Sequence, residues 1–76
     1  MNSRWLYFYL LERKSKTNVW TVNSKNQGTL LGEIRWYSPW RQYCFYPINS
    51  IFNSEGLGEI KKFLDDETEK RRHDGA

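Results

Sequence analysis

Residues 31–47 have the sequence LGEIRWYSPWRQYCFYP. Apolar and polar residues alternate on both sides of Ser38 and Pro39, and this period of two is typical of β-strands with one buried face. We therefore expect a β-hairpin. A four-residue loop is favoured, because a two-residue Ser-Pro turn would put Pro39 where a cis peptide bond is preferred.

The predicted hairpin has two unlike faces. In the expected register Trp36 faces Arg41 and Ile34 faces Tyr43, and an odd loop length would swap the faces of one strand relative to the other. The apolar face, which we expect to pack on the core, holds Leu30, Ile34, Trp36, Tyr43 and Phe45. The amphipathic face holds Leu31, Glu33, Arg35, Tyr37, Trp40, Gln42, Cys44 and Tyr46.

The flanking sequence predicts two more strands and one helix. Residues 5–14 are apolar at odd and even positions alike, which indicates a strand that is apolar on both faces. Residues 19–22 are β-branched and aromatic, and we expect them to pair with this strand. Asn53 or Ser54 is the expected N-cap of a helix. The apolar stripe of that helix holds Leu57, Ile60, Phe63 and Leu64.

These elements predict an α+β fold, a four-stranded antiparallel sheet that is broadly a meander, with one C-terminal helix packed on one face. The chain has 76 residues, 38% of them hydrophobic, and therefore has room for one core. We expect residues 1–65 to form a single compact domain. Residues 66–76 have no apolar stripe, so we expect a polar tail that is frayed or disordered.

Charge is unevenly distributed along the chain. Residues 1–54 carry seven Lys and Arg residues against two Glu, whereas residues 55–76 carry five Lys and Arg against seven Asp and Glu. A basic body is suited to an anionic partner, but the acidic segment opposes wrapping by a polyanion.

The residue types that catalysis and cofactor binding need are scarce. Cys44 is the single cysteine and His73 the single histidine, which excludes an internal disulfide and a four-cysteine zinc site. A nucleophilic pair of these two would require the tail to fold across the sheet. We expect no enzyme activity, no metal and no cofactor. The apolar run of residues 5–11 is too short to span a bilayer and precedes no cleavage site, so we expect a cytoplasmic protein.

A group of aromatic and basic residues on the predicted hairpin remains as the candidate site. The candidate binding residues are Arg35, Tyr37, Trp40, Arg41, Gln42 and Tyr46. Because Trp, Tyr and Arg dominate protein interfaces, the first hypothesis is a non-enzymatic adaptor or inhibitor that binds a protein. The strand that is apolar on both faces adds self-association as a homodimer to this hypothesis, since one helix covers only one face.

Two alternatives stay open for the same residues. Aromatic rings stack on unpaired bases and arginines bind phosphates, so the same face is suited to nucleic acid. Lys14, Lys16 and Lys25, in the predicted turns, are the candidate phosphate contacts in that case. The other alternative places the aromatic residues in the core, as we expect for Trp36, Tyr43 and Phe45.

Residues 31–47 also resemble a family of small, uncharacterised prokaryotic and phage-associated proteins. The shared pattern is LGxIxWYxPWRxYxFxP, followed by a short connection with Ile51 and Phe52 and then a helix. The resemblance covers about half the chain and implies a compact domain from a phage or mobile element. It implies no catalytic residue.

Overall fold

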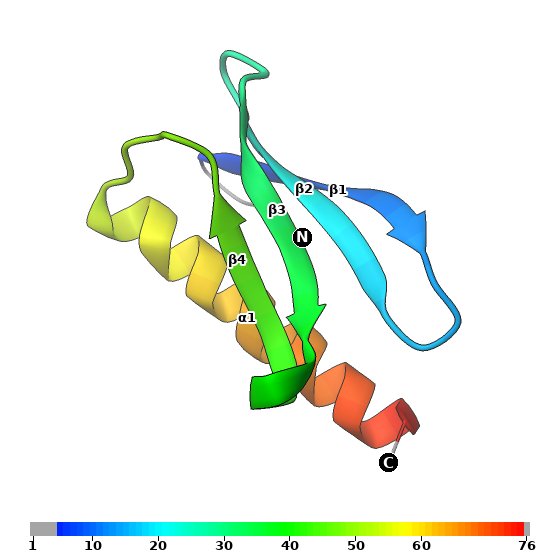
Figure 1. The fold of residues 1–76 in the computed structure, drawn as a ribbon. Coiled ribbons are helices and arrows are strands. Elements are labelled where there is room, and N and C mark those ends of the chain that lie inside the picture. The colour runs from blue at the N-terminus through cyan, green and yellow to red at the C-terminus, as the bar shows by residue number, and fades with distance from the viewer. Residues whose placement is uncertain (1–4, 76) are drawn as a thin grey trace.

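The computed structural model describes residues 5–75, which form one antiparallel sheet and one long helix (Figure 1). The elements in chain order are β1 (Leu6–Arg13), β2 (Asn18–Ser24), β3 (Leu30–Tyr37), the short 3-10 turn η1 (Ser38–Trp40), β4 (Gln42–Pro47) and α1 (Ser54–Gly75). The strands lie in the order β1-β2-β3-β4, each antiparallel to its neighbour. This arrangement confirms the predicted α+β meander with one helix.

The core lies between the sheet and α1, which crosses one face diagonally (Figure 1). Val22 and Ile34, on the two central strands, are fully buried. Phe63 of α1 stacks on Phe8 with ring centroids 4.2 Å apart and meets Trp20 edge-on at 5.0 Å. Aromatic pairs in these geometries contribute about 0.5–1.5 kcal/mol beyond the area they bury. One helical phenylalanine therefore joins β1 and β2 to α1.

The start of α1 follows the predicted cap. The Asn53 side-chain Oδ1 accepts a hydrogen bond from the Gly56 N–H at 2.8 Å, which satisfies one of the unpaired donors of the first turn. Ile60 and Phe63 are buried as predicted. Leu57, however, is half exposed, so its placement on the buried stripe was wrong.

The β3–β4 hairpin has the predicted four-residue loop but a different register. Trp36 faces Tyr43 and Ile34 faces Phe45, so the pairing is shifted by two residues along β4. Arg41 causes the shift by adopting a left-handed conformation (φ 55°, ψ 47°) that places Gln42, instead of Arg41, as the first paired residue. A shift of two preserves both faces, because side chains alternate with a period of two.

A bulge at the start of β3 reverses part of the predicted apolar face. The β2–β3 register shifts between Val22 and Asn23, with the result that Leu31 packs against the core and Leu30 is exposed. Gly32 follows the bulge and lies directly against β4. The sequence alternation does not reveal such a bulge, because the extra residue changes the face of everything before it.

Tyr43 is the point at which the edge strand β4 joins α1 and β2. Its backbone N–H donates to the Thr68 hydroxyl of α1 at 3.0 Å in a buried position. Its own hydroxyl accepts a hydrogen bond from the Asn18 N–H at 3.1 Å. Burial raises the pKa of this hydroxyl above that of an ordinary tyrosine, and the bond from Asn18 opposes the rise. The N–H and the hydroxyl of Tyr43 are therefore both hydrogen-bonded within the fold.

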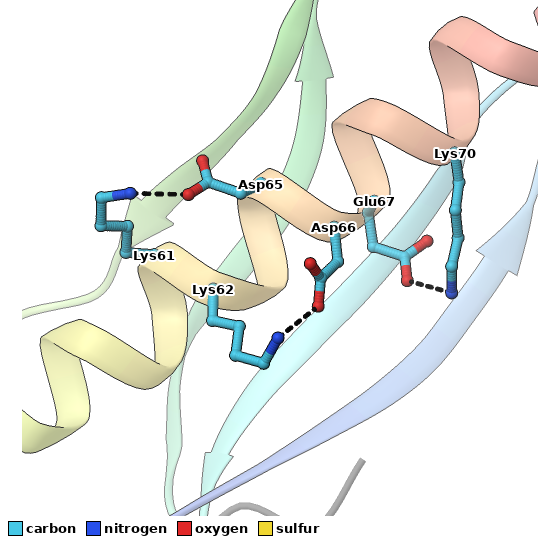
Figure 2. Close-up of polar contacts among 6 residues, drawn as sticks. All are labelled: Lys61, Lys62, Asp65, Asp66, Glu67 and Lys70. Carbon is cyan, nitrogen blue, oxygen red and sulfur yellow. Dashed lines mark hydrogen bonds and ion pairs between the residues drawn. The ribbon is translucent and has the colours of Figure 1, made fainter.

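Three ion pairs join side chains of α1 to one another, as drawn in Figure 2. Lys61 contacts Asp65 at 2.6 Å, and Lys62 contacts Asp66 at 3.2 Å, both with i,i+4 spacing. Such pairs support helix formation but add little to the stability of the fold. In the part of the chain that the structure describes, no helix combines the length and apolar character needed to cross a membrane.

The helix continues past Leu64 to Gly75, through the segment expected to be a tail. Buried Thr68 and half-buried Arg71, whose guanidinium lies 5.2 Å from the Trp36 ring, connect this segment to the hairpin. The expected fraying of residues 66–76 concerns motion in solution and stays a prediction.

Two glycine substitutions should shift stability in opposite directions. A Cβ at Gly32 would lie 2.5 Å from the Tyr46 carbonyl oxygen, so Gly32→Ala must move backbone, and we expect it to cost about 3 kcal/mol. Gly58 lies in α1 with open space around it, so Gly58→Ala should stabilise by about 0.5–1 kcal/mol. Urea denaturation measures both. Equal effects of the two would contradict the described packing of β3 on β4.

Thr68 provides a test of the contact between α1 and the edge of β4. Thr68→Val keeps the shape but removes the hydroxyl, leaving the buried Tyr43 N–H without an acceptor, and we expect a loss of about 1–3 kcal/mol in urea unfolding. Thr68→Ser, which keeps the hydroxyl, is the matched control and should lose much less. A valine variant as stable as the serine variant would show that the hydrogen bond does not form.

Candidate functional site

The face of the sheet opposite α1 is covered by no element of residues 5–75. Alternation along the strands directs every second side chain to this side, which we call the open face. The open face holds Tyr7, Tyr9, Thr21, Asn23, Glu33, Arg35, Tyr37 and Tyr46. Three of its tyrosines are strongly exposed, Tyr7 at 54%, Tyr9 at 51% and Tyr46 at 41%. The fold therefore presents several large aromatic side chains to solvent on one surface.

The charged residues at the centre of the open face neutralise each other. Arg35 Nε lies 2.7 Å from Glu33 Oε1, and both residues come from β3 with one position between them. Glu33 faces Tyr46 on β4 and Thr21 on β2, so the ion pair lies among uncharged neighbours. The Arg35 guanidinium is therefore already bound by a carboxylate.

A shallow hollow of about 430 Å³ lies on the β1 side of the open face. Its walls include the Tyr7 and Tyr9 rings, whose centroids are 6.4 Å apart, and Lys25 from the β2–β3 turn. The Asn23 side-chain amide donates to the Thr21 hydroxyl at 2.9 Å and lies 3.5 Å from the Tyr7 carbonyl oxygen. The floor of this hollow is thus uncharged and hydrogen-bonded.

Trp40 extends the aromatic surface at the β3–β4 loop. It is 64% exposed, and its ring meets that of Tyr37 edge-on at 4.9 Å. The next residue, Arg41, has its carbonyl oxygen bound by the Arg72 guanidinium at 3.2 Å. The loop is therefore held from the end of α1, and Trp40, besides contacting Tyr37, lines a hollow between β4 and α1.

The structure brings together some of the predicted site residues and separates others. Arg35, Tyr37 and Tyr46 share the open face, Trp40 and Arg41 form the adjoining loop, and Gln42 begins β4 at the same end. The predicted phosphate contacts are divided, because Lys14 and Lys16 lie in the β1–β2 turn and Lys25 lies in the β2–β3 turn, at opposite ends of β2 (Figure 1).

The sequence prediction of the site missed Tyr7 and Tyr9. Their signal was present, since β1 is apolar at both odd and even positions and α1 buries only the even ones. The prediction did not place the uncovered side of β1 on the same face of the sheet as the hairpin residues. Placing the two on one face requires the strand order, which the alternation pattern does not determine.

A second hollow of about 730 Å³ lies between β4 and α1, and both Cys44 and His73 line it. The helix thus brings these two residues to one groove, which the sequence analysis expected only from a folded-back tail. Burial raises the pKa of the Cys44 thiol, the opposite of the shift that activates a nucleophile. His73 Nε2 faces Glu69 at 3.6 Å. Cys44 in this groove therefore does not have the lowered thiol pKa of a nucleophilic cysteine.

The described residues contain no group of three or more His, Cys, Asp or Glu side chains placed to hold a metal ion. Comparisons with protein-family models, with curated proteins and with solved structures found no match for this chain. The resemblance of residues 31–47 to a phage-associated family therefore stays a prediction.

The Glu33–Arg35 pair generates a prediction about polyanion binding. Glu33→Gln removes the negative partner of Arg35 and should strengthen binding to a short single-stranded oligonucleotide several-fold at low salt, with the gain lost at high salt. Fluorescence anisotropy measures the affinity, and Glu33→Gln combined with Arg35→Gln is the control. Tight, salt-sensitive binding by the unaltered protein, unchanged by Glu33→Gln, would contradict a neutral open face.

Proposed function

We propose that the protein is a non-catalytic binding domain, an adaptor or inhibitor, whose open face and adjoining Trp40 bind a protein partner. The observation that carries the proposal is the exposure of Tyr7, Tyr9 and Tyr46 on the side of the sheet opposite α1, with exposed Trp40 in the adjoining β3–β4 loop. A 76-residue chain gains stability by burying its aromatic side chains, so four large ones left in solvent need another explanation.

The chemistry of this surface fits a protein partner. Tyr and Trp provide large contact areas at a small cost in conformational entropy and combine an apolar ring with a polar group. The residues that present them lie on strands and on a loop held by Arg72, so little further ordering is needed on binding. The Glu33–Arg35 pair gives a polar centre that can re-pair with groups of a partner.

Charge supports a protein over a nucleic acid as the partner. A surface that binds a phosphate backbone carries cations along the path of the strand. On the open face Arg35 is bound by Glu33, and the turn lysines stand at opposite ends of β2. Nucleic acid remains the alternative, with Trp40 and neighbouring Arg41 as the residues through which it would bind.

The proposal is tested by photo-crosslinking in cells that express the protein. We would place the photoreactive phenylalanine analogue p-benzoylphenylalanine at Tyr46 or at Tyr37, one variant at a time. The matched control carries it at Leu57, which is also exposed but lies on α1. We expect discrete protein adducts from the two open-face positions and none from the control.

Three outcomes would contradict the proposal. Adducts that disappear on nuclease treatment would establish nucleic acid as the partner. Equal adducts from Leu57 and the open-face positions would show nonspecific contact. The absence of adducts at Tyr46 and Tyr37 would show that the face is unoccupied. Both positions lie on β3 and β4, away from β1, so contacts made through β1 do not enter this result.

A further inference from the structure

β1 is an edge strand of unusual composition. It pairs only with β2, and no other segment of residues 5–75 lies along its outer side (Figure 1). Between Leu6 and Leu11 it contains no charged residue, no proline and no glycine. Proteins commonly protect an exposed edge with such residues, and an edge without them is a template for another strand.

The hydrogen-bond pattern shows which backbone groups of β1 are available. The Lys25 N–H donates to the Trp5 carbonyl oxygen at 3.0 Å, and the Tyr7 carbonyl oxygen lies near the Asn23 side chain of β2. Because the direction of backbone groups alternates along an antiparallel strand, odd-numbered residues of β1 bond toward β2. The N–H and C=O groups of Leu6, Phe8 and Leu10 therefore point outward.

The sequence of this edge is its own mirror image. Residues 6–10 are Leu-Tyr-Phe-Tyr-Leu, centred on Phe8. In an antiparallel pairing about a two-fold axis at Phe8, each Leu6 faces a Leu10 and each Tyr7 faces a Tyr9 of the other copy. The outward-pointing groups are those of residues 6, 8 and 10, which are the hydrogen-bonded positions in this register. Backbone bonding and side-chain matching therefore agree on one register.

We infer that two copies of this chain associate through β1, antiparallel and centred on Phe8, to form a continuous eight-stranded sheet. A second copy is favoured over an unrelated strand because residues 6–10 match themselves on both faces of the sheet. Residues 6–10 carry no charge, so two molecules of net charge +3 can meet at this edge without placing like charges opposite each other.

The size of the contact predicts its strength. Five residues per strand bury on the order of half the ~800 Å² per partner of a standard interface. The bulge between Leu10 and Glu12 limits regular pairing to this length. We therefore expect a micromolar dissociation constant. The dimer goes beyond the proposed binding function, and it would join two open faces side by side into one surface.

The first test follows the molecular mass of the full chain by sedimentation equilibrium as its concentration is raised through the micromolar range. The mass should rise from 9.2 kDa toward twice that value. In parallel, amide hydrogen exchange should slow with concentration at Phe8 and Leu10, whose N–H groups point outward, and stay unchanged at Tyr7 and Tyr9. A constant monomer mass, or protection that does not follow this alternation, would overturn the inference.

Paired substitutions test the register itself. Tyr7→Lys with Tyr9→Lys would place like charges opposite each other at both positions and should weaken the dimer about tenfold or more. Tyr7→Glu with Tyr9→Lys would place opposite charges at the same positions and should dimerise more tightly than the double-lysine protein. Both tyrosines are exposed, so the fold tolerates the changes.

Tyr46→Lys, on β4 at the far edge, is the control and should leave self-association unchanged. Equal dimerisation of the two double variants would overturn the Phe8-centred register. Any of these failures would leave the crosslinking result at Tyr46 unaffected, so the pairing and the proposed function fail separately.

Discussion

Phe63 of α1 packs on Phe8 of β1 and Trp20 of β2, and this contact holds the helix against one face of the four-stranded sheet. One helix covers one face of such a sheet, and the side chains that alternate to the other face have no cover from residues 5–75. The core is correspondingly small, with eight buried apolar side chains among the described residues. Within residues 5–75, a meander with one helix thus leaves both one face of the sheet and the outer edge of β1 uncovered.

The sequence was sufficient to predict the strands and the helix, the antiparallel character of the sheet and the cap of the helix, because periodicity and capping are local. The exact register of β3 with its two neighbouring strands could not be predicted from the sequence. The left-handed conformation of Arg41 shifts the hairpin by two residues, and arginine carries no signal for that conformation. The bulge that exchanges Leu30 and Leu31 is equally invisible to alternation. The contact of α1 with β4 beyond Leu64 has no apolar signal in the sequence, because buried Thr68 meets β4 through a hydrogen bond.

The candidate site was predicted in part for a related reason. Hairpin residues such as Tyr46 were identified because residue type and alternation were enough to place them on one face. Tyr9 and its neighbours on β1 were recognised as apolar but not joined to that face, since strand order is a property of the whole fold. The neutralisation of Arg35 by Glu33 depends on side-chain geometry, and it moves the balance from a polyanion toward a protein partner.

The central claim is that α1 buries one face of the sheet and leaves the tyrosine-bearing face in solvent. The most direct measurement is NMR relaxation enhancement of side-chain protons by a soluble paramagnetic probe, at a concentration where the protein is monomeric. We expect strong enhancement at the rings of Tyr7, Tyr9 and Tyr46 and weak enhancement at Tyr43 and Phe63. Protection of the first three, or exposure of Phe63, would contradict the account.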